Sequence, residues 1–190
     1  MDSKAYWTKE LQLKCQTGQT LDEYLEWIRR VHGNFDVDKY APPDPQLVVD
    51  VGGGLYGGAL LLYKGGKRRM LVDYCVDEYI KLKTLPDDVE ARRADFRDLS
   101  ILADNSVDVL FAYEVLDHAH DIFHFDKGQA ELCRILSPTG VMFFQHRLRH
   151  KPIIYHPVNV TEEGALKGFS SLKCISNIRI GRELYLTLKK

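Results

Sequence analysis

A glycine-rich stretch with an acid beside it is the part of this sequence most suited to chemistry. The stretch "GGGLYGG" runs from Gly52 to Gly58, and only two of its seven residues are not glycine. Glycine loses more conformational entropy on folding than any other residue, so this cluster indicates a loop that something approaches very closely. Gly52, Gly54 and Gly57 satisfy the G-x-G-x-x-G pattern of dinucleotide-binding loops, which also occurs in tight turns without a ligand.

Asp50, two residues before the first of these glycines, distinguishes between possible ligands. The pyrophosphate of a dinucleotide is an anion, and a carboxylate beside it would oppose its binding electrostatically. The same carboxylate would attract a cationic ligand. The residues therefore favour a cationic guest, with a nicotinamide-dependent oxidoreductase as the competing interpretation.

Alternating strand and helix patterns must position this loop. Such alternation is typical of a parallel sheet with helices on both faces. The sequence therefore predicts an α/β, Rossmann-like, doubly wound fold with a mostly parallel seven-stranded sheet, ending in an antiparallel C-terminal hairpin around Gly181. Strands are expected over 47–51, 68–74, 89–95, 107–113, 141–146 and on both sides of the turn in 173–190. Helices are expected over 56–64, with Gly65 and Gly66 past its end, and over 76–85, 126–136 and 161–169.

The segment before this alternation is expected to be helical. "TLDEYLEWIRRVHG" has Thr20 to cap a helix, Gly33 to end it, and apolar residues at helical spacing on one face. A proline-rich linker, "APPDPQ", follows it. We expect a helical cap segment over 1–45 and the main domain over 46–190. The cap could cover the mouth of the site or pack on the sheet, and the second arrangement is favoured.

Composition narrows the function classes. With 45% hydrophobic and 28% charged residues and a formal net charge of -1, the chain resembles a soluble globular protein and has no global attraction to nucleic acid or anionic membranes. Its four cysteines form no C-x-x-C pair, which indicates reduced thiols. The charged start lacks the apolar core of a signal peptide, and no apolar run approaches the ~20 residues of a membrane helix. A cytoplasmic protein without a membrane partner is expected.

The motif "VVDVGGG" resembles the first motif of the class I S-adenosylmethionine-dependent methyltransferases, in their type 11-like form. The resemblance implies S-adenosyl-L-methionine as the cofactor. It places Asp50 near the amino-acid end of the cofactor and Gly52, Gly53 and Gly54 against it. Tyr56 departs from the family, which often has glycine there.

Later motifs resemble the family in the same order, and the likeness covers about residues 48–144. Asp73 ends the second strand, where the resemblance implies an acceptor for both ribose hydroxyls, with Tyr74 next to it. The run "ADFRDLSILADNSVDVLFAYEVLDH" implies that Asp95 accepts from the adenine amine and that the backbone of Phe96 bonds the ring. By the same likeness, Tyr113 lies against the cofactor.

A histidine after the fourth strand is the candidate catalytic group. His118 matches a family position close to the transferred methyl group, where a base could take the proton of a hydroxyl. Its alternative role is structural, and His146 is a weaker candidate. The stretch "DHAHDIFHFD" could hold a divalent metal, but it matches no fixed ligand spacing, so no metal site is predicted.

The resemblance implies methyl transfer. No large insertion stands between the expected fourth and fifth strands or after the fifth, which leaves a small cap and favours a small-molecule or sugar acceptor, at a hydroxyl group. The alternatives are an RNA or protein methyltransferase and a cofactor-binding scaffold without catalysis. "AYEV" stands where enzymes that methylate nucleobase amines carry an N-P-P-Y-type tetrapeptide, so nucleic acid is not expected as a partner. The sequence does not specify the acceptor atom or the oligomeric state.

Overall fold

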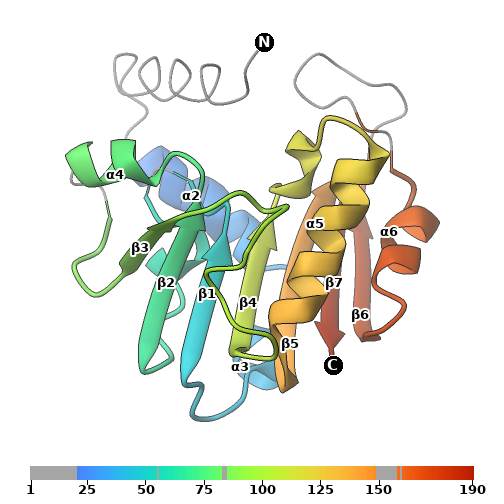
Figure 1. The fold of residues 1–190 in the computed structure, drawn as a ribbon, viewed down its shortest axis with the longest axis horizontal. Coiled ribbons are helices and arrows are strands. Elements are labelled where there is room, and N and C mark those ends of the chain that lie inside the picture. The colour runs from blue at the N-terminus through green and yellow to red at the C-terminus, as the bar shows by residue number, and fades with distance from the viewer. Residues whose placement is uncertain (1–20, 55, 83–84, 149–157, 159) are drawn as a thin grey trace.

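In a computed structural model, which describes residues 21–54, 56–82, 85–148, 158 and 160–190, seven strands form one sheet (Figure 1). Their order is β3-β2-β1-β4-β5-β7-β6. The first five strands in this order run parallel to one another, and β7 is antiparallel to both β5 and β6. The predicted α/β fold, with its antiparallel C-terminal hairpin, is confirmed. The strands are β1 (Leu47–Val51), β2 (Arg68–Asp73), β3 (Glu90–Arg93), β4 (Val107–Tyr113), β5 (Leu136–Arg147), β6 (Lys173–Ile180) and β7 (Glu183–Lys189).

Helices cover both faces of the sheet, as Figure 1 shows for α5 on one face and α2 on the other. Neighbouring residues of β1 face opposite ways: Val49 packs in the core cluster that contains residues of α5 and α6, and Val48 in the cluster that contains residues of α2 and α4. The described helices are α2 (Leu21–His32), α3 (Val37–Tyr40), α4 (Val76–Leu82), α5 (Ile122–Ile135) and α6 (Glu162–Gly168), with two short 3-10 helices, η1 (Gly58–Leu61) and η2 (Leu116–His118).

The connection between β1 and β2 contains a shorter helix than the sequence predicts. The helix predicted over 56–64 is wrong, and the short 3-10 helix η1 takes its place. Gly57 and Gly58 have φ angles of 85° and 51°, so right-handed helical geometry starts only after them, and Gly66 at 95° interrupts it again.

The N-terminal helix α2 packs on the sheet, with Ile28 and Val31 buried. Leu21, predicted on the apolar face, is instead exposed. The predicted cap residue Thr20 lies outside the described residues. The division of the chain into 1–45 and 46–190 stays a prediction.

The loops after β1 and β4 meet where the strand order reverses. In doubly wound sheets this switch point, beyond the carboxyl ends of the strands, is where ligands bind. In the described part of the chain, no helix is long and apolar enough to cross a membrane.

Candidate functional site

A cavity of about 440 Å³ lies at this switch point. Its size is in the range of small-ligand sites. Loops after β1, β2, β3 and β4 contribute to its wall, together with α2 and the end of β5. Every predicted site residue except Asp50 lines it: Gly52, Gly53, Gly54, Asp73, Tyr74, Asp95, Phe96, Tyr113 and His118.

Asp50 lies beneath the glycine loop and does not line the cavity. Its side chain is buried, and Oδ2 accepts a hydrogen bond of 2.6 Å from the backbone N–H of Ala59. A Cβ on Gly53 would lie 2.7 Å from this oxygen, and one on Gly58 would overlap it. These two glycines therefore make room for the Asp50 carboxylate.

The Asp50 carboxyl favours its neutral form in the folded chain. Burial raises its pKa to about 8, and the nearby charge of Asp73 adds to this effect, while the Ala59 hydrogen bond opposes it. Asp50 therefore stabilises the loop through its buried hydrogen bond to Ala59.

Gly54 is where the loop comes closest to the open cavity. Its φ of 71° is a conformation that side chains disfavour, and a Cβ there would meet nothing nearer than the Tyr24 hydroxyl at 3.6 Å. Its N–H donates to Asp73 Oδ2 at 3.3 Å. Gly54 therefore joins the loop directly to the acid at the end of β2.

Asp73 is held by hydrogen bonds on both of its oxygens. Oδ1 accepts from the Cys75 N–H at 2.8 Å and from the Tyr79 hydroxyl at 3.2 Å, while Oδ2 accepts from Gly54. Burial raises the pKa of Asp73, although these hydrogen bonds oppose the rise. A carboxylate has about four lone-pair sites, so these three donors leave acceptor capacity for a ligand hydroxyl.

Asp95 is paired with Arg97, which the sequence reasoning missed. The guanidinium donates twice, from Nε to Oδ1 at 2.7 Å and from Nη2 to Oδ2 at 2.5 Å. Burial alone would raise the pKa of Asp95, but the hydrogen bonds and charge of Arg97 outweigh it and lower the pKa. Arg97 also lies 5.9 Å from the centre of the Phe96 ring. A ligand amine would share Asp95 with this guanidinium.

Helix α2 packs on the sheet and also contributes to the cavity wall. The Tyr24 hydroxyl donates to the Gly53 carbonyl at 2.7 Å, and its ring lies 5.0 Å from that of Tyr56. Trp27, one turn later on α2, is also in the cavity wall. The glycine loop is therefore held on one side by the hydrogen bond from Tyr24 of α2 and on the other by the hydrogen bond to the buried Asp50.

The histidine-rich stretch divides into separate roles. His118 and His120 line the cavity. Asp117 is buried in contact with the ring of His146, which does not line the cavity. Asp121 caps α5 by accepting from a backbone N–H at 2.8 Å, so this helix starts earlier than predicted. Among the described residues, no three potential metal ligands gather at one place.

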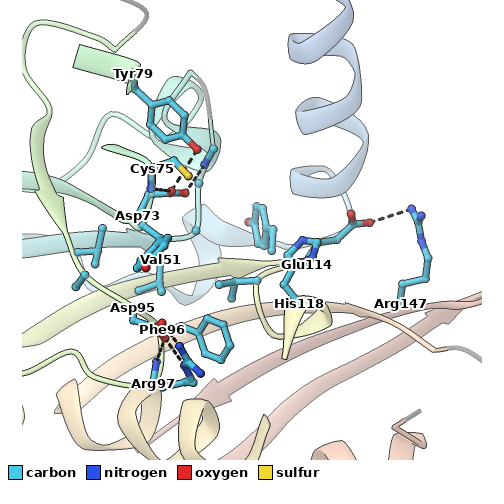
Figure 2. Close-up of a pocket in the computed structure, with 18 of the residues that line it drawn as sticks. Val51, Asp73, Cys75, Tyr79, Asp95, Phe96, Arg97, Glu114, His118 and Arg147 are labelled. Atoms are coloured by element: carbon cyan, nitrogen blue, oxygen red, sulfur yellow. Dashed lines mark hydrogen bonds and ion pairs between the residues drawn. The ribbon is translucent and has the colours of Figure 1, made fainter. Parts of the chain in front are cut away.

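Two further cavity residues, Glu114 and Arg147, had no role in the sequence interpretation. Figure 2 shows their side chains pointing toward one another, with an ion pair of 2.9 Å between them. The sequence did offer one indication of a role for Glu114, because it directly follows a predicted strand, at the edge of the sheet where ligands bind.

Comparison with a family described as "Methyltransferase domain" gives a match over residues 49–144. No protein of curated function matches the chain. Among solved structures, the SAH complex of DhpI is similar, with a TM-score of 0.70 and 16% identity over 98% of this chain and 94% of that one. The PH0226 protein of Pyrococcus horikoshii OT3 has a TM-score of 0.68 and 17% identity, over 90% and 92%.

A third similar structure is that of the [4+2]-cyclase SpnF. Its TM-score is 0.60 and its identity 16%, over 80% of this chain and 58% of that chain. At these identities the structural likeness shows the fold alone. A fold of this kind hosts more than one chemistry, so function must be argued from the cavity.

Proposed function

This chain belongs to the methyltransferase-domain family, whose cofactor is S-adenosylmethionine, and from that premise we propose that it methylates a hydroxyl group of a small molecule or a sugar. The observation that carries the proposal is the joint placement of the glycine loop and Asp73 in one cavity wall, joined by the Gly54 N–H. Bound S-adenosylmethionine supplies a methyl group on a sulfonium, activated for in-line displacement by a nucleophile.

The residues present fit this cofactor. Gly52, Gly53 and Gly54 give a wall without side chains, along which the backbone can meet the cofactor. Asp73 has acceptor capacity left for the ribose hydroxyls. Asp95, with Phe96 beside it, can take a hydrogen bond from the adenine amine.

The remaining predicted residues divide between cofactor and loop. Tyr74 and Tyr113 are part of the cavity wall. Asp50 is assigned to the loop instead of to the cofactor, because its carboxylate faces Ala59 from beneath. Because burial favours the neutral form of this carboxyl, no charge attraction to the cofactor is assigned to it.

His118 is the proposed base. It lines the cavity from η2, beyond the carboxyl end of β4. An imidazole near neutral pH can accept the proton that a hydroxyl loses as its oxygen attacks the methyl group. The rest of the rate enhancement comes from alignment of the two reactants and exclusion of water.

A small polar acceptor fits this end of the cavity better than a macromolecule. Tyr24 and Trp27 of α2 form part of its wall, and His118, Glu114 and Arg147 give it polar groups. The formal net charge of -1 also provides no general attraction to RNA.

The test is a transfer screen with S-adenosylmethionine that carries tritium in its methyl group. Panels of monosaccharides, phenols, hydroxy acids, RNA and protein extracts are offered to the purified chain. Label should pass to a hydroxyl-bearing small molecule and not to RNA or protein. Label in a macromolecular fraction would shift the acceptor class, and no transfer to any panel would support the scaffold alternative.

A further inference from the structure

Glu114 has a backbone conformation that side chains rarely adopt. Its φ is 53°, in the left-handed region, although it is neither glycine nor asparagine. Strain of this kind persists only where the surroundings impose it, and it is concentrated at functional sites. Glu114 is the first residue after β4, and its side chain is part of the cavity wall.

The neighbouring strand fixes Glu114 in this conformation. The last pair of the β4–β5 ladder is Tyr113 with Gln145, and the N–H of Glu114 then donates to the carbonyl of Gln145 at 3.0 Å. The chain turns directly afterwards into η2, which carries His118. The strained residue therefore stands between the central strand and the proposed base.

Arg147 holds the Glu114 side chain but is shared with another acid. Its Nη2 lies 2.9 Å from Glu114 Oε1, while its Nε donates to Glu183 Oε1 at 2.6 Å. Two carboxylates thus compete for one guanidinium. Within the described residues, Glu114 Oε1 accepts no hydrogen bond of good geometry, so its contact with Arg147 is an ion pair.

The surroundings make Glu114 a strong hydrogen-bond acceptor. Burial raises the pKa of its carboxyl, and the negative charge of Asp117 adds to the rise, whereas Arg147 lowers it. A hydrogen bond from the Gln145 side chain also lowers the pKa of Glu114. A hydrogen bond from a ligand hydroxyl to a carboxylate is charge-assisted and is therefore stronger than one between neutral groups.

Glu114 also lies apart from the acids assigned to the cofactor. Figure 2 shows Asp73 and Asp95 toward one side of the cavity and Glu114 and His118 toward the other. Asp73 ends β2 and Asp95 follows β3, whereas Glu114 follows β4.

We propose that the carboxylate of Glu114 accepts a hydrogen bond from the hydroxyl group of the methyl acceptor, and that Arg147 positions that carboxylate. This rests on the proposed function, since it assigns the second subsite of the same cavity. The hydroxyl carries a single hydrogen. In the bound complex this hydrogen points to Glu114 and fixes the position of the acceptor oxygen, and it then turns to His118, which takes the proton as the oxygen attacks the methyl group. A carboxylate here repels anions, so the acceptor has no negative group next to the hydroxyl that is methylated.

The test separates binding from transfer. Phenols, neutral monosaccharides and hydroxy acids are titrated by ligand-observed NMR against the chain saturated with S-adenosylhomocysteine. Glu114→Gln keeps the shape of the side chain and removes its charge. Glu183→Gln is the matched control, because Glu183 also pairs with Arg147 but does not line the cavity. S-adenosylhomocysteine affinity and thermal unfolding are measured for each variant to establish that it is folded.

We expect neutral hydroxyl compounds to bind the unaltered chain and Glu114→Gln to weaken them about tenfold or more. S-adenosylhomocysteine affinity should stay within about twofold, and Glu183→Gln should change fragment binding less than threefold. Unchanged fragment binding in Glu114→Gln, preferential binding of the hydroxy acid anions, or no fragment binding to the unaltered chain would overturn the inference. The fragments that bind are then offered tritiated S-adenosylmethionine. Glu114-dependent binding without label transfer would contradict the proposed function while leaving this subsite assignment in place.

Discussion

The Asp50 carboxylate accepts a hydrogen bond from the Ala59 N–H at 2.6 Å, across the base of the glycine loop. This contact explains part of the glycine cluster without any ligand, because side chains on Gly53 or Gly58 would collide with the same oxygen. The loop shape is thus built from inside the protein, and Gly54 is left facing the cavity. The loop thus combines the buried Asp50, which fixes its shape, with the half-buried Gly54, which faces the cavity.

Gly58→Ala should destabilise the fold more than Gly181→Ala. Both glycines have positive φ, 51° and 60°, so each substitution carries a backbone penalty of about 1–2 kcal/mol. Only the Cβ at Gly58 also meets Asp50 and the backbone of Gly53, whereas Gly181 has nothing within 4 Å. Overpacking of this kind adds about 1–3 kcal/mol.

Urea unfolding of both variants measures the difference. Equal losses of stability would mean that the Asp50 contact does not constrain the loop.

Asp50→Asn should flatten the dependence of stability on pH. The folded-state pKa of Asp50, about 8, lies above its ordinary value of 3.8, so the folded chain holds this proton more tightly than the unfolded chain. Its contribution is complete below about pH 4 and is lost as the pH rises through 8. Between pH 6 and pH 9 the melting temperature of the unaltered chain should fall by several degrees because of this group, at about 2–4 °C per kcal/mol.

Thermal melts across this range compare Asp50→Asn with the exposed control Asp87→Asn. The account fails here if the first variant follows the same pH curve as the second.

Tyr24→Phe should loosen the contact between α2 and the glycine loop. It removes the hydrogen bond of 2.7 Å to the Gly53 carbonyl, which has a net value of about 1 kcal/mol, while keeping the ring. We expect a lower melting temperature by about 2–4 °C and weaker S-adenosylhomocysteine binding, since Gly53 lines the cavity. Calorimetric titration that shows unchanged affinity would separate α2 from the cofactor site.

His118→Ala should lower methyl transfer about a hundredfold, the usual order for loss of a general base, with little effect on S-adenosylhomocysteine affinity. Treatment with EDTA should leave transfer intact. Both are measured on whichever acceptor the transfer screen identifies. If EDTA stops the reaction and magnesium or manganese restores it, the acids and histidines after β4 act as metal ligands and the base assignment is wrong.

The sheet could be predicted from sequence because it depends on local patterns, whereas the predicted residues of the cavity wall followed mainly from the resemblance of the motifs to a known family. Apolar runs mark β1 and β4, and "LVDY" puts Asp73 at the end of β2. The pairing of Asp95 with Arg97 was also within reach, since the two are separated by one residue. By contrast, the hydrogen bond between Asp50 and the Ala59 N–H joins residues nine positions apart, and it forms only because the loop folds back over Asp50. Glu114 follows β4 and Arg147 ends β5, so their ion pair is a contact between distant parts of the chain. Sequence periodicity does not predict such contacts.

The most direct test of the central claim, that this cavity holds S-adenosylmethionine beside Asp73, is calorimetric titration of the unaltered chain and of Asp73→Asn with S-adenosylhomocysteine, with NAD as the competing ligand. S-adenosylhomocysteine should bind the unaltered chain in a one-to-one complex, and NAD should not bind. Replacing the carboxylate should weaken S-adenosylhomocysteine by about 2 kcal/mol, roughly thirtyfold, in a variant that still melts cooperatively. NAD binding to the unaltered chain, or full S-adenosylhomocysteine affinity in folded Asp73→Asn, would contradict the account.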